Sequence, residues 1–176
     1  GKNFAIGYID IDGFKPYNDV YGYSKGDLVI ELLAQIIQAE VNRDDFVGHI
    51  GGDDFIVLST DSAVVETAQR ICLNFSKRMA HYYLPEHVAA GGFYATDRLG
   101  SLCFYPLLSL SVGLAMPDTT VCSNYHDVAA LASDAKQQAK KTPGPAVFVN
   151  KRRVPEHLAR LATVVSEAAP ERQGMQ

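Results

Sequence analysis

The strongest constraint on the fold is a pair of short β-rich runs joined by a tight acidic turn. Asp45 to Ile50 and Phe55 to Ser59 flank Gly51-Gly52-Asp53-Asp54, whose glycines and aspartates are typical of hairpin turns. Helical and strand-like patterns surround this hairpin on both sides. A hairpin within such a mixed chain predicts an α+β fold with a central, mostly antiparallel sheet flanked by helices, and argues against a doubly wound parallel sheet.

The remaining periodicities predict elements before and after the hairpin. Phe4 to Asp10 and Leu107 to Met116 are apolar runs typical of buried strands. Apolar residues at helical spacing predict helices over Asp27 to Val41 and Ser62 to Tyr82, with Ser62 as an N-cap. We expect further elements at an inserted hairpin within residues 83–106, a helix over Tyr125–Lys141, a strand over Ala146–Val149 and an amphipathic helix over Pro155–Ala168.

Length and charge narrow the class of protein. The 176 residues suit one domain over residues 1–150, followed by a connector helix and tail over residues 151–176. Acidic residues number 20 and basic residues 16, which argues against a dedicated nucleic-acid binder. The three cysteines show no metal-site spacing and fit a reducing compartment, and no apolar run is long enough for a membrane span. We therefore expect a cytoplasmic domain without direct membrane contact, cut from a longer protein.

The first candidate site follows the N-terminal strand, at Asp10-Ile11-Asp12-Gly13-Phe14-Lys15. A carboxylate at the end of a buried strand is a common metal ligand or nucleophile, and the N–H groups of the next turn can bind phosphate oxygens. Two other readings stay open here. The segment could be a solvated turn, or the start of a phosphatase of the haloacid dehalogenase type.

Three further groups of residues could carry chemistry. Asp53 and Asp54 form an acidic hairpin tip, which is costly unless water or a cation neutralises it. Asn18 and Asp27 could together read a guanine edge, although Asp27 could equally cap a helix. Lys140 stands at the end of a predicted helix, where a cation also suits the helix dipole. Each signal is weak alone.

Taken in order, these motifs resemble the GGDEF domain of diguanylate cyclases, over Phe4 to about Val149. That family has a nucleotidyl cyclase-like, ferredoxin-like sheet. The resemblance rests on these matching segments: Asp10-Ile11-Asp12-Gly13-Phe14-Lys15, Asn18-Asp19-Val20-Tyr21-Gly22, Gly26-Asp27, Gly51-Gly52-Asp53-Asp54-Phe55, Ser111-Val112-Gly113 and Ala139-Lys140.

The resemblance implies an enzyme of bacterial second-messenger signalling that condenses two GTP molecules to cyclic di-GMP and releases pyrophosphate. Catalysis would need a homodimer, because each domain binds one GTP. The residue roles that it implies are as follows: Mg²⁺ (or Mn²⁺) held by Asp10, the Ile11 carbonyl and Asp53; phosphates bound by Phe14, Lys15 and Lys140; guanine selected by Asn18 and Asp27; and Asp54 near the attacking ribose hydroxyl.

Three departures from the family pattern bear on activity. Asp54 stands where the family has the longer Glu, and Asn42 stands where an inhibitory product site has Arg. The Arg that usually follows the Ala-Lys motif is missing before Pro145. We therefore expect reduced activity and no ordinary product-inhibition site. The alternative is a degenerate domain that binds GTP or cyclic di-GMP and regulates an attached domain without efficient synthesis.

Overall fold

The computed structural model describes residues 4–117 and 125–150, which form a five-stranded sheet, a second two-stranded sheet and surrounding helices. The strands of the large sheet lie in the order β2-β3-β1-β6-β7, and only β6 and β7 are parallel. This confirms the expected, mostly antiparallel sheet. The strands are β1 (Ala5–Asp12), β2 (Phe46–Gly51), β3 (Asp54–Ser59), β6 (Ser109–Ala115) and β7 (Ala146–Val149).

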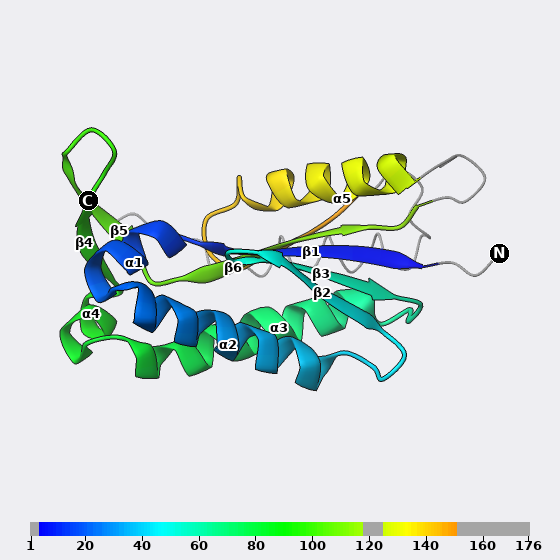
Figure 1. The fold of residues 1–176 in the computed structure, drawn as a ribbon, viewed down its shortest axis with the longest axis horizontal. Helices are drawn as coiled ribbons and strands as arrows, with labels where there is room; N and C mark the ends of the chain where they lie inside the picture. The colour runs from blue at the N-terminus through cyan, green and yellow to red at the C-terminus, as the bar shows by residue number, and fades with distance from the viewer. Residues whose placement is uncertain (1–3, 118–124, 151–176) are drawn as a thin grey trace, which may run out of the picture.

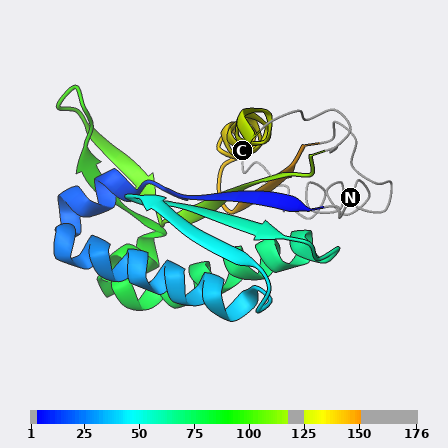
Figure 2. The same ribbon diagram turned by 45° about the vertical axis from the view of Figure 1, so that its right-hand side comes forward.

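Helices cover both faces of this sheet. Helices α2 (Tyr23–Glu40) and α3 (Val64–Met79) pack together below one face, and α5 (Tyr125–Ala139) lies across the other (Figure 1). The short α1 (Phe14–Tyr21) follows β1 at one end of the sheet (Figure 2). Among the described helices, none is both long and apolar enough to cross a bilayer.

The central strand β1 divides its side chains between two apolar clusters. Ala5, Ile9 and Ile11 belong to the main core, which lies between the sheet and helices α2 and α3. Ile6 and Tyr8 belong to a smaller cluster with Ala132 of α5. Because successive strand residues point to opposite faces, Asp10 lies on the α5 side with Tyr8. The alternation of β1 therefore decides which helix its acidic end meets.

A second hairpin projects beyond the end of the main sheet (Figure 1). It consists of β4 (Gly92–Thr96) and β5 (Leu102–Pro106), after the 3₁₀ turn η1 (Ala80–Tyr82) and the short helix α4 (Pro85–Ala90). The tip is held by Asp97, whose Oδ1 accepts the N–H groups of Leu99 at 2.8 Å and Ser101 at 2.9 Å. The inserted hairpin is therefore confirmed, but Gly91 ends α4 and lies outside the strands.

Several predicted helix boundaries are wrong. Helix α2 begins at Tyr23, so Asp27 lies within it and is not its N-cap. The sequence pattern also missed α1, which is separated from α2 only by Gly22 with a φ of 87°. Ser62 does not cap α3; instead, Oδ1 of Asp61 accepts the N–H of Ala63 at 2.9 Å.

The later boundaries differ less. Helix α5 ends at Ala139, two residues before the predicted end, and Lys140 follows directly. The predicted strand over Ala146–Val149 is confirmed as β7. The predicted helix over Pro155–Ala168 and the division at residue 150 concern residues 151–176, which lie outside the described residues.

Gly113 of β6 lets the backbone of α5 approach the sheet. A Cβ at this position would overlap the backbone N of Lys136 and the carbonyl carbon of Ala135. We predict that Gly113→Ala lowers the free energy of unfolding by about 3 kcal/mol, because helix and strand must separate. Urea denaturation measures this. The control is Gly48→Ala on β2, whose Cβ would meet only the exposed Phe46 ring; equal losses in the two variants would contradict the prediction.

Candidate functional site

Three carboxylates gather where β1 ends and the β2–β3 hairpin turns. Asp10 lies directly opposite Asp54 in the register of β1 and β3. Asp53 precedes it at the hairpin tip, and one oxygen from each of the three side chains lies within 4.8 Å of the others. Asp10 is buried, with 3% of its surface exposed. The structure thus brings together the three acidic residues that the sequence predicted for metal binding and catalysis.

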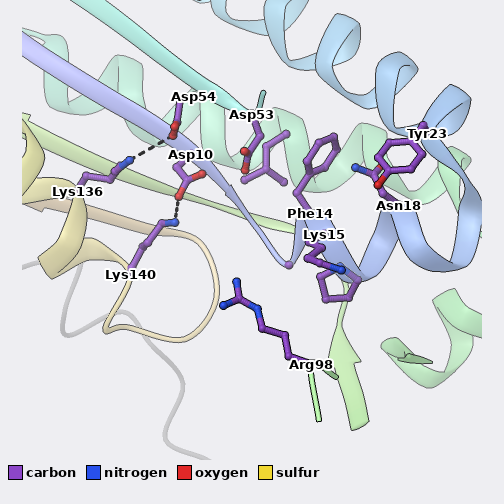
Figure 3. Close-up of a pocket in the computed structure, with 13 residues that line it drawn as sticks. Asp10, Phe14, Lys15, Asn18, Tyr23, Asp53, Asp54, Arg98, Lys136 and Lys140 are labelled. Carbon is purple, nitrogen blue, oxygen red and sulfur yellow. Dashed lines mark hydrogen bonds and ion pairs between the residues drawn. The ribbon is translucent and has the colours of Figure 1, made fainter. Parts of the chain in front are cut away.

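Two lysines of the α5 region face this acidic cluster (Figure 3). Nζ of Lys136 donates to Oδ1 of Asp54 at 3.2 Å and lies 3.9 Å from the centre of the Tyr8 ring. Lys140 forms an ion pair with Asp10. Lys140 directly follows the end of α5, and its backbone N–H donates to the carbonyl of Lys136 at 3.0 Å, so the two side chains lie one helical turn apart on the same side. Lys136 was missed by the sequence reasoning, although this spacing from Lys140 was an available signal.

Burial sets the protonation behaviour of the groups around the cluster. It raises the pKa of Asp53, and the adjacent Asp54 carboxylate raises it further. Desolvation lowers the pKa of Lys140. Both shifts disfavour the charged forms. A bound cation would offset the shift of Asp53, since it favours an ionised carboxylate.

Asp12 belongs to a separate hydrogen-bond arrangement on the same face. It accepts from Oγ of Ser109 at 3.0 Å and from Oγ of Ser111 at 2.7 Å. Burial raises the pKa of Asp12, and these hydroxyl groups oppose that rise. Its carboxylate oxygens are thus occupied within the protein. This fits a role in holding β1 against β6.

A cavity of about 490 Å³ opens beside the acidic cluster, a size within the usual range for small-molecule sites. The first turn of α1 contributes Phe14 and Lys15 to its wall, and Lys15 pairs with Asp19 at 2.8 Å. Figure 3 shows how these side chains surround the opening. The full lining consists of Asp10, Ile11, Gly13, Phe14, Lys15, Pro16, Asn18, Tyr23, Asp53, Asp54, Arg98, Lys136 and Lys140.

The two predicted guanine-reading residues are placed differently. Asn18 lines the cavity, and its Oδ1 is buried without a hydrogen-bond partner among the described residues. This oxygen lies against Gly26, where any Cβ would overlap it. Asp27 is exposed on α2 and is not part of the cavity wall. The structure therefore brings Asn18 to the cavity, whereas the role of Asp27 stays a prediction.

Asn42, at the position of the expected inhibitory arginine, takes part in a contact between loops. Its Nδ2 donates to Oδ2 of Asp61 at 2.7 Å, and its backbone N–H donates to Oδ2 of Asp45 at 2.9 Å. The carboxylate of Asp45 is thus bound to the backbone of its own loop. The expected loss of product inhibition stays a prediction.

Comparison with known proteins decides the family. A family model described as "Diguanylate cyclase, GGDEF domain" matches residues 1–144. The chain belongs to the GGDEF domain family. This match, together with the antiparallel neighbours of β1, favours the cyclase family over the phosphatase reading of Asp10 and Asp12.

Curated relatives of this GGDEF domain are much longer proteins. The diguanylate cyclase DosC of Escherichia coli (strain K12) is 28% identical over 148 residues, covering 80% of this chain and 27% of that protein. The bifunctional diguanylate cyclase/cyclic di-GMP phosphodiesterase MucR of Pseudomonas aeruginosa is 42% identical over 57 residues, covering 32% of this chain and 8% of that protein. The chain thus spans about a quarter or less of these relatives.

Solved structures share the fold of this GGDEF domain. The active GGEEF domain of a diguanylate cyclase from Vibrio cholerae superposes with a TM-score of 0.61 and 23% identity, covering 86% of this chain and 85% of that chain. The GGDEF domain of DgcB from Caulobacter crescentus, in complex with c-di-GMP, gives a TM-score of 0.59 and 22% identity, covering 84% and 77% of the two chains. At these identities the likeness establishes the fold alone.

Lys136 should matter for stability as well as for the site. We predict that Lys136→Met lowers the free energy of unfolding by about 1–2 kcal/mol, because Asp54 and Tyr8 lose a cation and the repulsion between Asp10 and Asp54 grows. Urea denaturation of the domain measures the loss. Lys141→Met is the matched control, since Lys141 is exposed, donates to Oε1 of Gln138 at 3.1 Å and lies outside the cavity wall. Indistinguishable stabilities of the two variants would contradict the predicted role.

Proposed function

We propose that this domain condenses two GTP molecules to cyclic di-GMP with release of two pyrophosphates. The observation that carries the proposal is the cluster of Asp10, Asp53 and Asp54 beside a cavity lined by cationic side chains. Phosphoryl transfer depends on charge neutralisation and alignment more than on covalent catalysis, and this arrangement supplies both kinds of charge. The family membership and the cyclase names of the relatives support the same reaction.

The acidic cluster fits a divalent metal. Carboxylate and carbonyl oxygens are the ligands that Mg²⁺ prefers, and Mn²⁺ accepts the same ones. In the proposal, Asp10 and Asp53 hold the ion together with the backbone carbonyl of Ile11, which lines the same cavity. A bound ion neutralises negative charge on the phosphate groups during transfer.

The other wall residues take roles around the nucleotide. Phe14 and Lys15, in the first turn of α1, bind phosphate together with Lys140. Asn18, which lines the cavity, contacts guanine through its side-chain amide. Asp27, on the neighbouring helix α2, contacts the same base. Asp54 accepts a proton from, or orients, the attacking 3′-hydroxyl of a GTP bound to the second domain of a homodimer.

A second candidate is nucleotide binding without efficient synthesis. The ion pair of Asp54 with Lys136 favours it, because a carboxylate held by an ammonium group is less free to contact the attacking hydroxyl. In this case the domain binds GTP or cyclic di-GMP and regulates an attached domain. The shorter side chain of Asp54 points in the same direction, since small displacements of catalytic groups lower rates strongly.

Product analysis separates the two candidates. Concentrated protein is incubated with GTP and Mg²⁺, and cyclic di-GMP is quantified by chromatography. We predict synthesis that rises more steeply than linearly with protein concentration and falls to background in Asp53→Asn and Asp27→Ala. Asp44→Asn, which changes an exposed acid away from the cavity, should keep the rate. If no product forms at any protein concentration but calorimetry still shows GTP binding, the proposed synthesis is refuted and the second candidate, nucleotide binding, is supported.

The length of the residue at position 54 provides a second test. We predict that Asp54→Glu raises the rate of synthesis by about 10-fold, because the added methylene carries the carboxylate closer to the reacting hydroxyl. The rate is measured at saturating GTP. Asp44→Glu is the matched control, since it makes the same change at an exposed position. An equal or lower rate in Asp54→Glu would refute the proposed role of Asp54.

A further inference from the structure

Arg98 reaches the nucleotide cavity from the tip of the β4–β5 hairpin, an element that none of the site motifs includes. It is one of the residues lining the cavity, with Lys15 and Lys140. In Figure 3 its guanidinium group extends from the hairpin toward Lys140. The hairpin thus adds a cation to a wall that is otherwise built from β1, α1, α2, β3 and the α5 region.

Arg98 differs from the other cations of the wall in having no carboxylate partner among the residues that the structure describes. Lys15 pairs with Asp19, Lys136 with Asp54 and Lys140 with Asp10. Within residues 4–117 and 125–150, no carboxylate lies within ion-pair distance of Arg98. Its positive charge is therefore available to a ligand in the cavity.

The neighbouring acid does not neutralise this charge. Asp97 is occupied by the backbone N–H groups of Leu99 and Ser101, at 2.8 and 2.9 Å, and its Oδ2 accepts from the thiol of Cys103 at 3.5 Å. These bonds fix the loop that carries Arg98. The turn that carries the guanidinium group is thus already ordered by hydrogen bonds. Less conformational entropy is therefore lost when a ligand binds to this group.

Lys15 and Arg98 line the same cavity, and their positive charges act on each other. Asp19 raises the pKa of Lys15, and the positive charge of Arg98 opposes this rise. Like charges brought together at the mouth of a cavity favour an anionic ligand of high charge. A guanidinium group also suits phosphate oxygens, because its N–H groups form a fork that can bind two of them.

We propose that Arg98 binds the terminal phosphates of the nucleotide, so that the β4–β5 hairpin forms part of the substrate site. This inference rests on the proposed function, since it assumes a guanine nucleotide in the cavity. It assigns the hairpin a role in recognising the number of phosphates. A nucleoside triphosphate therefore binds more tightly because Arg98 contacts its terminal phosphates. The single phosphate of a monophosphate does not reach Arg98.

Calorimetry with the full chain tests this assignment. The probes are a GTP analogue with a methylene bridge between the α- and β-phosphates, and GMP, each with Mg²⁺. We expect Arg98→Ala to weaken binding of the analogue by about 10- to 100-fold, as for loss of a hydrogen bond to a charged group. Arg98→Lys should recover part of this loss, and GMP binding should stay within about twofold. The salt dependence of analogue binding should also decrease in Arg98→Ala.

Arg43→Ala serves as the matched control, because Arg43 is exposed and lies outside the cavity wall. Thermal unfolding of each variant is recorded, and Arg98→Gln replaces Arg98→Ala if the latter unfolds at a lower temperature. Unchanged analogue affinity, or equal losses for the analogue and GMP, would overturn the role of Arg98 and leave the proposed function intact. Failure of the unmodified protein to bind the analogue would instead overturn the proposed function, and this assignment with it.

Discussion

The repulsion between Asp10 and Asp54 is the constraint on which the site depends. The antiparallel register of β1 and β3 places these residues directly opposite each other, and like charges in such positions destabilise a sheet. Lys136 and Lys140 offset that repulsion from the opposing helix layer. They can do so because Gly113 leaves room for the backbone of α5 on β6. The absence of a side chain at Gly113 of β6 thus allows the lysines to neutralise the carboxylates of β1 and β3.

The same strand links this charge balance to the stability of the whole domain. β1 lies in the middle of the sheet and contributes Ile9 and Ile11 to the main core. Asp10 lies between Ile9 and Ile11 and points to the opposite face of the sheet, toward α5. The packing of the two isoleucines in the core therefore fixes the position of the carboxylate. A buried acid at this place costs stability unless a cation meets it. Part of the hydrophobic stabilisation therefore offsets the cost of burying this carboxylate.

The sequence was sufficient for the sheet and for the residues whose neighbours are close along the chain. The hairpin of β2 and β3 and the strand before Asp10 follow from local turn chemistry and apolar patterning. The division of α1 from α2 was missed, because a single Gly22 separates them and the apolar stripe begins only later. Arg98 was also missed, since tertiary packing alone brings the β4–β5 hairpin to the cavity. Lys136 was missed although its one-turn spacing from Lys140 indicated it. Asp27 was predicted with Asn18, yet the cavity wall includes only Asn18.

The one-turn spacing of Lys136 and Lys140 has a mechanical consequence. One ammonium group is attached to the last turn of α5 and the other to the residue that follows it, and the backbone of this helix lies against Gly113. A rotation or sliding of α5 therefore displaces both positive charges together. The electric field at the acidic cluster therefore changes with the position of α5, because both lysine charges move with this helix.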